Sequence, residues 1–337
     1  MYETFFGLTG KPFQLNPDPA FFFGSRGHKR AFAYLQYGLH QSEGFIIVTG
    51  EIGAGKTTLV RNLLAQVDPT RLIAAQLVST QLDADDLLRA VTTAFGLPTR
   101  AVDKAQLLAE LEAFLVSLLP QGKRALLIVD EAQNLSGRAI EELRMLSNFQ
   151  LGNLGLLQSF LVGQPELRQL MQGPEMQQLR QRVTASYHLG PMDRADTQAY
   201  VEHRLRHVGW KGDPRFEHGA FDVIYSFSSG IPRRINTLCN RLLLAAYLSE
   251  KHDVTAADVE ATADEIKLEM TGGSRNAQGP SPLSALPSVG GGNFGEPVPG
   301  LEERVVRLER AMTATLDFLQ QILRPAAGQK PPDQAKG

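Results

Sequence analysis

Residues 50–57 decide the fold, and they read Gly50-Glu-Ile-Gly-Ala-Gly-Lys56-Thr57. They match the G-x-x-x-x-G-K-[ST] pattern in full, after an apolar strand pattern and before a helical one, which is the context that the pattern requires. The glycines let backbone N–H groups turn inward around phosphates, and the helix N-terminus adds a partial positive charge. We expect Lys56 to reach the β- and γ-phosphates and Thr57 to hold Mg²⁺. The expected nucleotide-binding residues are Gly50, Glu51, Ile52, Gly53, Ala54, Gly55, Lys56, Thr57 and Thr58.

A second motif lies downstream, where the apolar run Ala125–Val129 ends in Asp130 and Glu131. Asp130 is expected to hold the Mg²⁺ shell, and Glu131 to act as the general base on the attacking water. An acidic pair after a strand also often caps a helix. Beside the phosphate-binding loop, however, it predicts Mg²⁺-dependent nucleotide hydrolysis. The N/T-K-x-D element that usually selects guanine is missing from the sequence, which favours ATP.

The sequence around these motifs alternates short β-branched runs with helical patterns over residues 45–190. Near-continuous apolar strands that alternate with helices predict a parallel sheet covered on both faces. The expected strands are Phe45–Thr49, Leu72–Val78, Ala125–Val129, Leu156–Val162 and Ala185–Leu189. The expected helices are Lys56–Gln66, Asp83–Phe95, Ala105–Leu119 and Ala139–Phe149. Residues 191–270 carry four helical patterns, so the predicted fold is an α/β P-loop core with an all-α lid.

The remaining segments have other patterns. Residues 1–44 form an aromatic, Pro-rich strap and a helix, whose rings either face the adenine or fasten the segment to the core. Residues 271–300 hold eight Gly, five Pro and four Ser, which predicts a flexible linker. Residues 301–324 keep an apolar heptad seam and predict a coiled-coil-like helix that docks on its own chain or associates with a partner. Residues 325–337 are expected to be a disordered tail.

Further polar residues are candidates for the same reaction. Gln164 follows a predicted strand and is expected to contact the γ-phosphate or the water, unless it only faces solvent. Arg180 and Arg182 precede the fifth strand, and one of them, Arg182 first, is expected to act as an arginine finger on a neighbouring subunit. Arg233 opens the third lid helix and is expected to reach back to the γ-phosphate. For each arginine the alternative is a solvated surface charge.

Composition limits the other classes of function. The formal net charge of −2 argues against a chain that binds nucleic acid along its whole length. The single cysteine, Cys239, rules out an intramolecular disulfide or a Cys-based zinc site. No apolar run approaches a membrane span, and the N-terminus lacks a secretory signal, so we expect a cytoplasmic protein.

Several short motifs are informative as a set: Lys11-Pro-Phe13, Pro17-Asp-Pro19, Phe22-Phe23, residues 49–58, Val129-Asp-Glu-Ala-Gln133, Gly163-Gln-Pro-Glu-Leu167, Gln181-Arg182 and Gly230-Ile-Pro-Arg233. The set resembles the AAA+ ATPases of the general-secretion type. More closely it resembles the secretion ATPases of PEP-CTERM/exosortase (exopolysaccharide) loci. The resemblance covers about residues 1–270. It implies a five-stranded core with a helical lid, and subunits that assemble into rings or arrays. By matching position, it also implies that Gln164 is sensor 1, that Arg182 is the arginine finger and that Arg233 is sensor 2.

The resemblance implies three kinds of partner: further copies of the chain, an envelope-export component and a polysaccharide-synthesis component. Residues 271–337 hold no membrane span, so any inner-membrane association is expected to be peripheral and through a partner. Two alternatives stay open. One is a DNA-binding regulator like the transposition-type AAA+ proteins, which would use the basic cluster Arg204, Arg206, His207, Lys211 and Arg215. The other is a slow nucleotide switch in another pathway.

Overall fold

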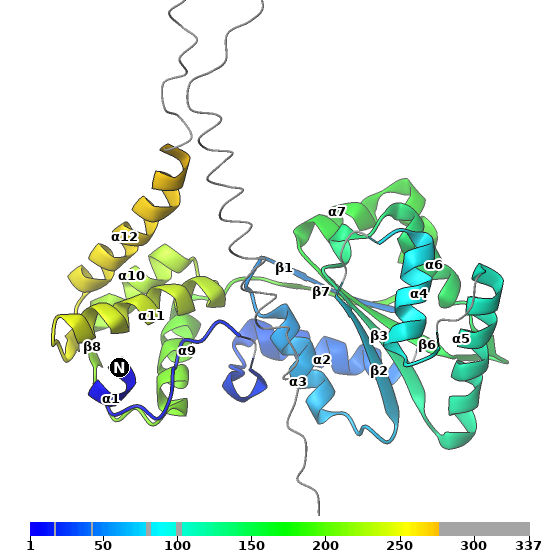
Figure 1. Cartoon of the computed structure of the whole chain (residues 1–337), viewed down its shortest axis with the longest axis horizontal. Coiled ribbons are helices and arrows are strands. Elements are labelled where there is room, and N and C mark those ends of the chain that lie inside the picture. Colours follow the sequence, from blue (N-terminus) through cyan, green and yellow to red (C-terminus); the bar gives the residue numbers. More distant parts are fainter. Residues whose placement is uncertain (17, 42, 79–81, 99–102, 276–337) are drawn as a thin grey trace, which may run out of the picture. The chain divides into compact units, whose positions relative to one another are not determined.

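The computed structural model describes residues 1–275, apart from residues 17, 42, 79–81 and 99–102 (Figure 1). The chain divides into two units after residue 277, and the described residues all belong to the first. The expected heptad helix over residues 301–324, the tail over 325–337 and the linker beyond residue 275 lie outside the described residues. The architecture below is that of the first unit.

A five-stranded parallel sheet in the order β2-β3-β6-β1-β7 forms the core. Its register places Phe45 opposite Ser159 on one side and Val183 on the other. Parallel pairing brings the carboxyl ends of all the strands to one edge, where the motifs meet. The predicted parallel sheet is confirmed, and its strands are β1 (Phe45–Gly50), β2 (Leu72–Val78), β3 (Arg124–Asp130), β6 (Leu157–Gly163) and β7 (Val183–Leu189).

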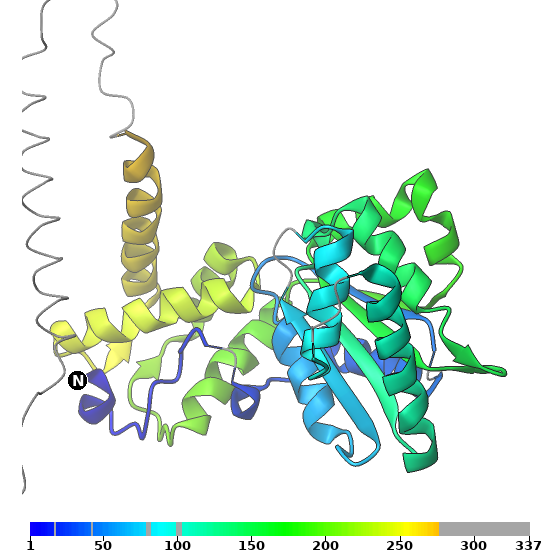
Figure 2. The ribbon, with the colours of Figure 1, turned by 45° about the vertical axis from the view of Figure 1, so that its right-hand side comes forward.

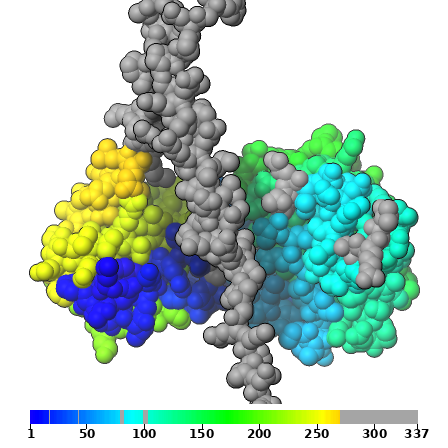
Figure 3. Space-filling view, in the orientation of Figure 1, coloured from blue at the N-terminus to red at the C-terminus, as the bar shows by residue number. Residues whose placement is uncertain are grey.

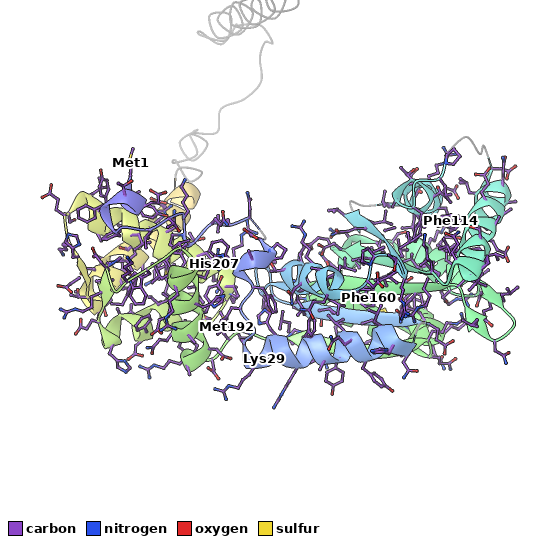
Figure 4. All side chains as sticks on the ribbon, turned by 90° about the horizontal axis from the view of Figure 1, so that it is seen from below. Met1, Lys29, Phe114, Phe160, Met192 and His207 are labelled. Atoms are coloured by element: carbon purple, nitrogen blue, oxygen red, sulfur yellow. The ribbon has the colours of Figure 1, made fainter. Side chains whose placement is uncertain are left out.

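Helices cover both faces of the sheet because alternate strand residues are apolar on both sides. Ile46, Val48 and Phe160 face a cluster with α2 (Arg26–Gln41) and α3 (Lys56–Gln66), and Figure 4 shows Phe160 next to α2. Ile47, Leu127 and Leu161 face the opposite cluster. The helices on that side are α4 (Ala84–Ala94), α5 (Lys104–Leu118), α6 (Gly137–Leu146), α7 (Pro165–Gln172) and α8 (Gln177–Arg180).

The lid is a helical domain with its own apolar cluster. The N-terminal segment packs into that cluster through Tyr2, Phe6 and Phe13, and the Tyr2 hydroxyl donates to Asn240 Oδ1 at 2.9 Å. Figures 2 and 3 show this segment, in blue, against the lid helices. The strap therefore packs mainly on the lid, which was not expected, while Phe22 packs against the sheet cluster and lines the cavity beside Lys56. The lid helices are α9 (Arg194–His207), α10 (His218–Ser228), α11 (Pro232–Leu248) and α12 (Ala256–Arg275).

Helix α12 corrects the expected domain boundary at residue 271. The Thr255 N–H donates to Asp258 Oδ2 at 3.0 Å and the Asp258 N–H donates to Thr255 Oγ1 at 3.3 Å, which is a capping box, and the helix then continues through residues 271–275. Once a helix is nucleated, each further residue adds a backbone bond, so Gly272 and Gly273 weaken the helix without ending it. The linker that sequence analysis placed from residue 271 therefore cannot begin before residue 276.

Short elements complete the described chain. They are α1 (Tyr2–Phe5), the hairpin of β4 (Gln150–Leu151) with β5 (Leu154–Gly155), and the pair of β8 (Arg215–Phe216) with β9 (Asp253–Val254). Two-residue strands are too short to show periodicity, which explains why sequence analysis missed them. Within the described part of the chain, no helix combines the length and apolar character that crossing a bilayer requires.

Candidate nucleotide site

The loop of residues 50–55 joins β1 to α3 at the carboxyl edge of the sheet. Gly53 has a φ of 82°, and a Cβ atom there would lie 2.4 Å from the Cβ of Arg233, so only glycine fits. Lys56 is 6% exposed, and its Nζ donates to Gly50 O at 2.6 Å and to Glu51 O at 3.0 Å. Burial lowers the pKa of Lys56, and the nearby Glu131 and Asp130 carboxylates oppose that shift. The loop therefore holds a buried cation at its centre.

Two oxygen ligands meet beside this cation. Thr57 Oγ1, in the first turn of α3, donates to Asp130 Oδ2 at 2.9 Å, at the end of β3. The second carboxylate oxygen of Asp130 accepts from the backbone N–H of Glu131 at 3.0 Å. Hydroxyl and carboxylate oxygens are the donor set that Mg²⁺ prefers, so this pair fits the ion.

Glu131 lies next to Asp130 with a left-handed φ of 53°. Its Oε2 accepts from Gln164 Nε2 at 3.0 Å and from Gln133 Nε2 at 2.6 Å. Burial raises the pKa of Glu131, but these two amides and the charge of Lys56 outweigh it, so the pKa falls below its usual value. The structure thus brings Glu131 and Gln164 together and keeps the carboxylate ionised. Sequence analysis gave Gln133 no role, although it stands two residues after Glu131.

Arg233 reaches this site from the lid. It opens α11, and its backbone N–H donates to Gly53 O at 3.2 Å. Its exposed side chain lines a cavity of about 430 Å³ together with Lys56, Thr57 and Glu131. The structure therefore brings a lid arginine and the loop to the same cavity.

His28 was not predicted to have a role, but in the structure its side chain bonds to the backbone of the phosphate-binding loop. Its Nε2 bonds to Ala54 O at 3.2 Å, and its Nδ1 bonds to Ser25 Oγ at 2.7 Å. Since a carbonyl can only accept, Nε2 is the donor, and the neutral imidazole accepts at Nδ1. Burial lowers the pKa of His28, with opposing contributions from Ala54 and Asp196. A lone histidine in a helix gives no sequence signal for such a contact.

Arg204 was grouped with surface cations in sequence analysis, but the structure buries it. Its Nε donates to Pro12 O at 2.5 Å and its Nη2 to Gln14 O at 3.2 Å, and its guanidinium lies 4.7 Å from the Phe21 ring centroid. Arg206 and Arg215 pair with Glu202 and Asp253 on the surface. The expected basic cluster is therefore engaged largely within the chain.

Arg182 and Arg180 lie away from this cavity. Arg182 directly precedes β7, at the amino edge of the sheet, where its Nη1 donates to Ser147 O at 3.0 Å and Ser147 Oγ at 2.8 Å. Arg180 Nη1 donates to Met171 O at 2.7 Å and Gly173 O at 2.8 Å. At about 3.3 Å per residue, the length of the strand separates Arg182 from the loop of its own chain by roughly 20 Å.

Comparison with known proteins agrees with this geometry. Residues 39–171 match a family model described as an AAA domain. This range includes the loop of residues 50–55 and strands β1, β2, β3 and β6, so this part of the chain has the P-loop fold of an AAA domain. General secretion pathway protein A of Aeromonas hydrophila is 41% identical over 267 residues, which cover 79% of this chain and 48% of that protein. The chain thus spans about half the length of this relative.

Solved structures share the fold of the AAA domain. The Aeropyrum pernix ORC2 protein in its ADP form has a TM-score of 0.56 at 17% identity, covering 75% of this chain and 72% of that one. Cdc6p from Pyrobaculum aerophilum has a TM-score of 0.54 at 14% identity, covering 78% and 70%. The AAA domain and this P-loop fold support nucleotide binding and ATP hydrolysis.

Proposed function

We propose that the chain is a Mg²⁺-dependent AAA+ ATPase that works as an oligomer and drives or regulates assembly of an envelope export system. The observation that carries the proposal is the convergence of Lys56, the Thr57–Asp130 pair and Glu131 at one edge of the sheet. This set can bind a triphosphate, hold a metal ion and activate a water molecule. The resemblance to general secretion pathway protein A supports the export setting.

Each residue of the site has a distinct role in the proposed reaction. The N–H groups of residues 50–58 and Lys56 bind the phosphates, and Thr57 and Asp130 would hold Mg²⁺. Bound Mg²⁺ would neutralise charge that develops on the phosphate oxygens. Glu131, kept ionised by its amide neighbours, accepts a proton from the attacking water. Gln164 orients that carboxylate, and Arg233 contacts the γ-phosphate from the lid.

The position of Arg182 supports the proposed oligomer. This arginine lies at the amino edge of the sheet and cannot reach the loop of its own chain, so as a finger it would serve a neighbouring subunit in a ring or array. Arg182 must first leave Ser147 to do so. Arg180, whose two partners are backbone carbonyls, stays the second candidate.

The narrower setting is export of exopolysaccharide at a PEP-CTERM/exosortase locus, with the chain in the cytoplasm and peripheral at the inner membrane through a partner. The motif set of residues 11–233 supports it. A partner from the export or polysaccharide-synthesis machinery would bind the chain, with residues 301–324 as the first candidate segment.

The first test is ATP turnover per subunit in a protein dilution series, with and without duplex DNA. A rate that rises with protein concentration and ignores DNA supports a shared site in an oligomer. A rate that rises only with DNA would favour the DNA-binding regulator. A flat, slow rate in both conditions would favour a monomeric nucleotide switch and contradict the oligomeric ATPase.

A further inference from the structure

We propose that Gln133 is a positioning residue for ATP hydrolysis, because its amide ties the Glu131 carboxylate to the carboxyl end of β6. This inference rests on the proposed function of Glu131 as the general base. Gln133 lies in the short helical turn Ala132–Asn134 that follows Glu131, so it approaches the carboxylate from the same loop. Its role differs from that of the residues that contact the nucleotide.

Both ends of the Gln133 amide are engaged. Nε2 donates to Glu131 Oε2 at 2.6 Å, and Oε1 accepts from the backbone N–H of Gln164 at 2.9 Å. The side chain of Gln164 then donates to the same Glu131 Oε2 at 3.0 Å. The three residues form a closed ring of hydrogen bonds across the ends of β3 and β6. An amide that donates at one end and accepts at the other fixes both partners at once.

The backbone around the ring is adapted to this contact. A Cβ atom at Gly163 would lie 2.8 Å from Gln133 Oε1, so the last residue of β6 must be glycine for the amide to approach. Glu131 itself has a φ of 53°, a left-handed conformation that residues other than glycine rarely adopt. The ring supplies hydrogen bonds that hold the carboxylate in this conformation.

The arrangement leaves one carboxylate oxygen for chemistry. Both amides donate to Oε2, and among the described residues no side chain donates to Oε1, which can accept a proton from water. Lys56 on α3 is a charged group that acts on this carboxylate, and Arg233 on α11 lines the same cavity. Both residues are retained when Gln133 alone is changed, so a loss of turnover would report on the amide.

The test is steady-state ATP turnover of the full chain, with kcat and KM for ATP both measured at saturating Mg²⁺ and at one pH. Gln133→Leu removes both hydrogen bonds, and we expect kcat to fall about tenfold or more while KM for ATP changes less than about twofold. A fall in kcat without a matching change in KM is what a misplaced Glu131 carboxylate would give. Gln169→Leu, an exposed glutamine on α7, is the matched control and should leave kcat and KM unchanged.

A second variant keeps the test decisive if Gln133→Leu fails to fold. Gln133→Glu keeps an oxygen that can accept from the Gln164 N–H, but a carboxylate cannot donate to Glu131 Oε2, so kcat should again fall with KM for ATP changed less than about twofold. If both variants keep the kcat and KM of Gln169→Leu, the positioning role is wrong.

Glu131→Gln separates this inference from the proposed function. It should remove turnover while nucleotide still binds. Turnover that survives Glu131→Gln contradicts the general base and the positioning role together. Turnover lost in Glu131→Gln but unchanged in the Gln133 variants overturns only the positioning role.

Discussion

The two edges of the parallel sheet use charged side chains in different ways. At the carboxyl edge, Lys56, Thr57 and Glu131 line one cavity, and Thr57 bonds to Asp130 beside it. At the amino edge, the Arg182 guanidinium donates to Ser147, the residue that follows α6. The difference supports the proposal that one chain binds the nucleotide by itself, whereas an arginine at the amino edge would act on another copy.

The largest expected effect tests the carboxyl edge. Lys56→Ala removes the buried cation at the centre of the loop, and we expect nucleotide binding to be lost. A fluorescent ATP analogue titrated into each variant measures it. Lys29→Ala, an exposed lysine on α2, is the control and should bind as the parent does (Figure 4). Normal binding by Lys56→Ala would mean that this edge is not the phosphate site.

The next effect tests the amino edge. Arg182→Ala should bind ATP normally and lose turnover, by up to the roughly 10³–10⁵-fold that an arginine finger contributes. Arg180→Ala is the matched control. Mixing Arg182→Ala with Lys56→Ala should restore part of the activity, because the second variant still supplies an arginine to its neighbour. If Arg182→Ala keeps turnover while Arg180→Ala loses it, Arg180 is the finger instead.

A smaller effect tests whether Arg233 of the lid contributes to nucleotide binding at the carboxyl edge. Arg233→Ala removes one cationic contact to the expected γ-phosphate, and hydrogen bonds to charged groups are worth about 1.5–3 kcal/mol. We therefore expect ATP affinity to fall about 10- to 100-fold, with ADP affinity changed less, as calorimetry would show. Arg234→Ala, the exposed neighbour on α11, should leave both affinities unchanged. Equal losses for ATP and ADP would place the arginine away from the γ-phosphate.

The sequence predicted much of the carboxyl edge because its residues follow strands and are fixed by local backbone. The Gly50–Thr57 loop and the Asp130–Glu131 pair each lie in one short stretch whose spacing carries the chemistry. The contacts that cross the chain could not be predicted in this way. His28 meets Ala54, and Arg204 meets Pro12, only after the tertiary structure forms. Arg204 stands among other cations in the sequence, which indicated a surface position, but the structure buries it.

The smallest effect concerns how the carboxyl edge is supported, through His28. Burial lowers the pKa of His28 in the folded chain, so the unfolded chain binds more protons as pH falls below the usual histidine value of about 6.5. Its contribution to stability is thus complete above that pH, and is lost progressively as pH falls toward the folded pKa. His28→Gln should cost about 1–3 kcal/mol at pH 7.5 through the changed buried hydrogen bonds. It should also lose less stability than the parent between pH 7.5 and 5.5.

Urea unfolding at both pH values measures this difference. His218→Gln, an exposed histidine that opens α10, is the control and should follow the parent. If the prediction holds, α2 stabilises the phosphate-binding loop through His28, although this helix lies outside the loop motif. If His28→Gln loses as much stability on acidification as the parent, the imidazole is not held neutral in the folded chain. Both ring nitrogens would then carry protons, with Nδ1 donating to Ser25 Oγ and Nε2 still donating to Ala54 O.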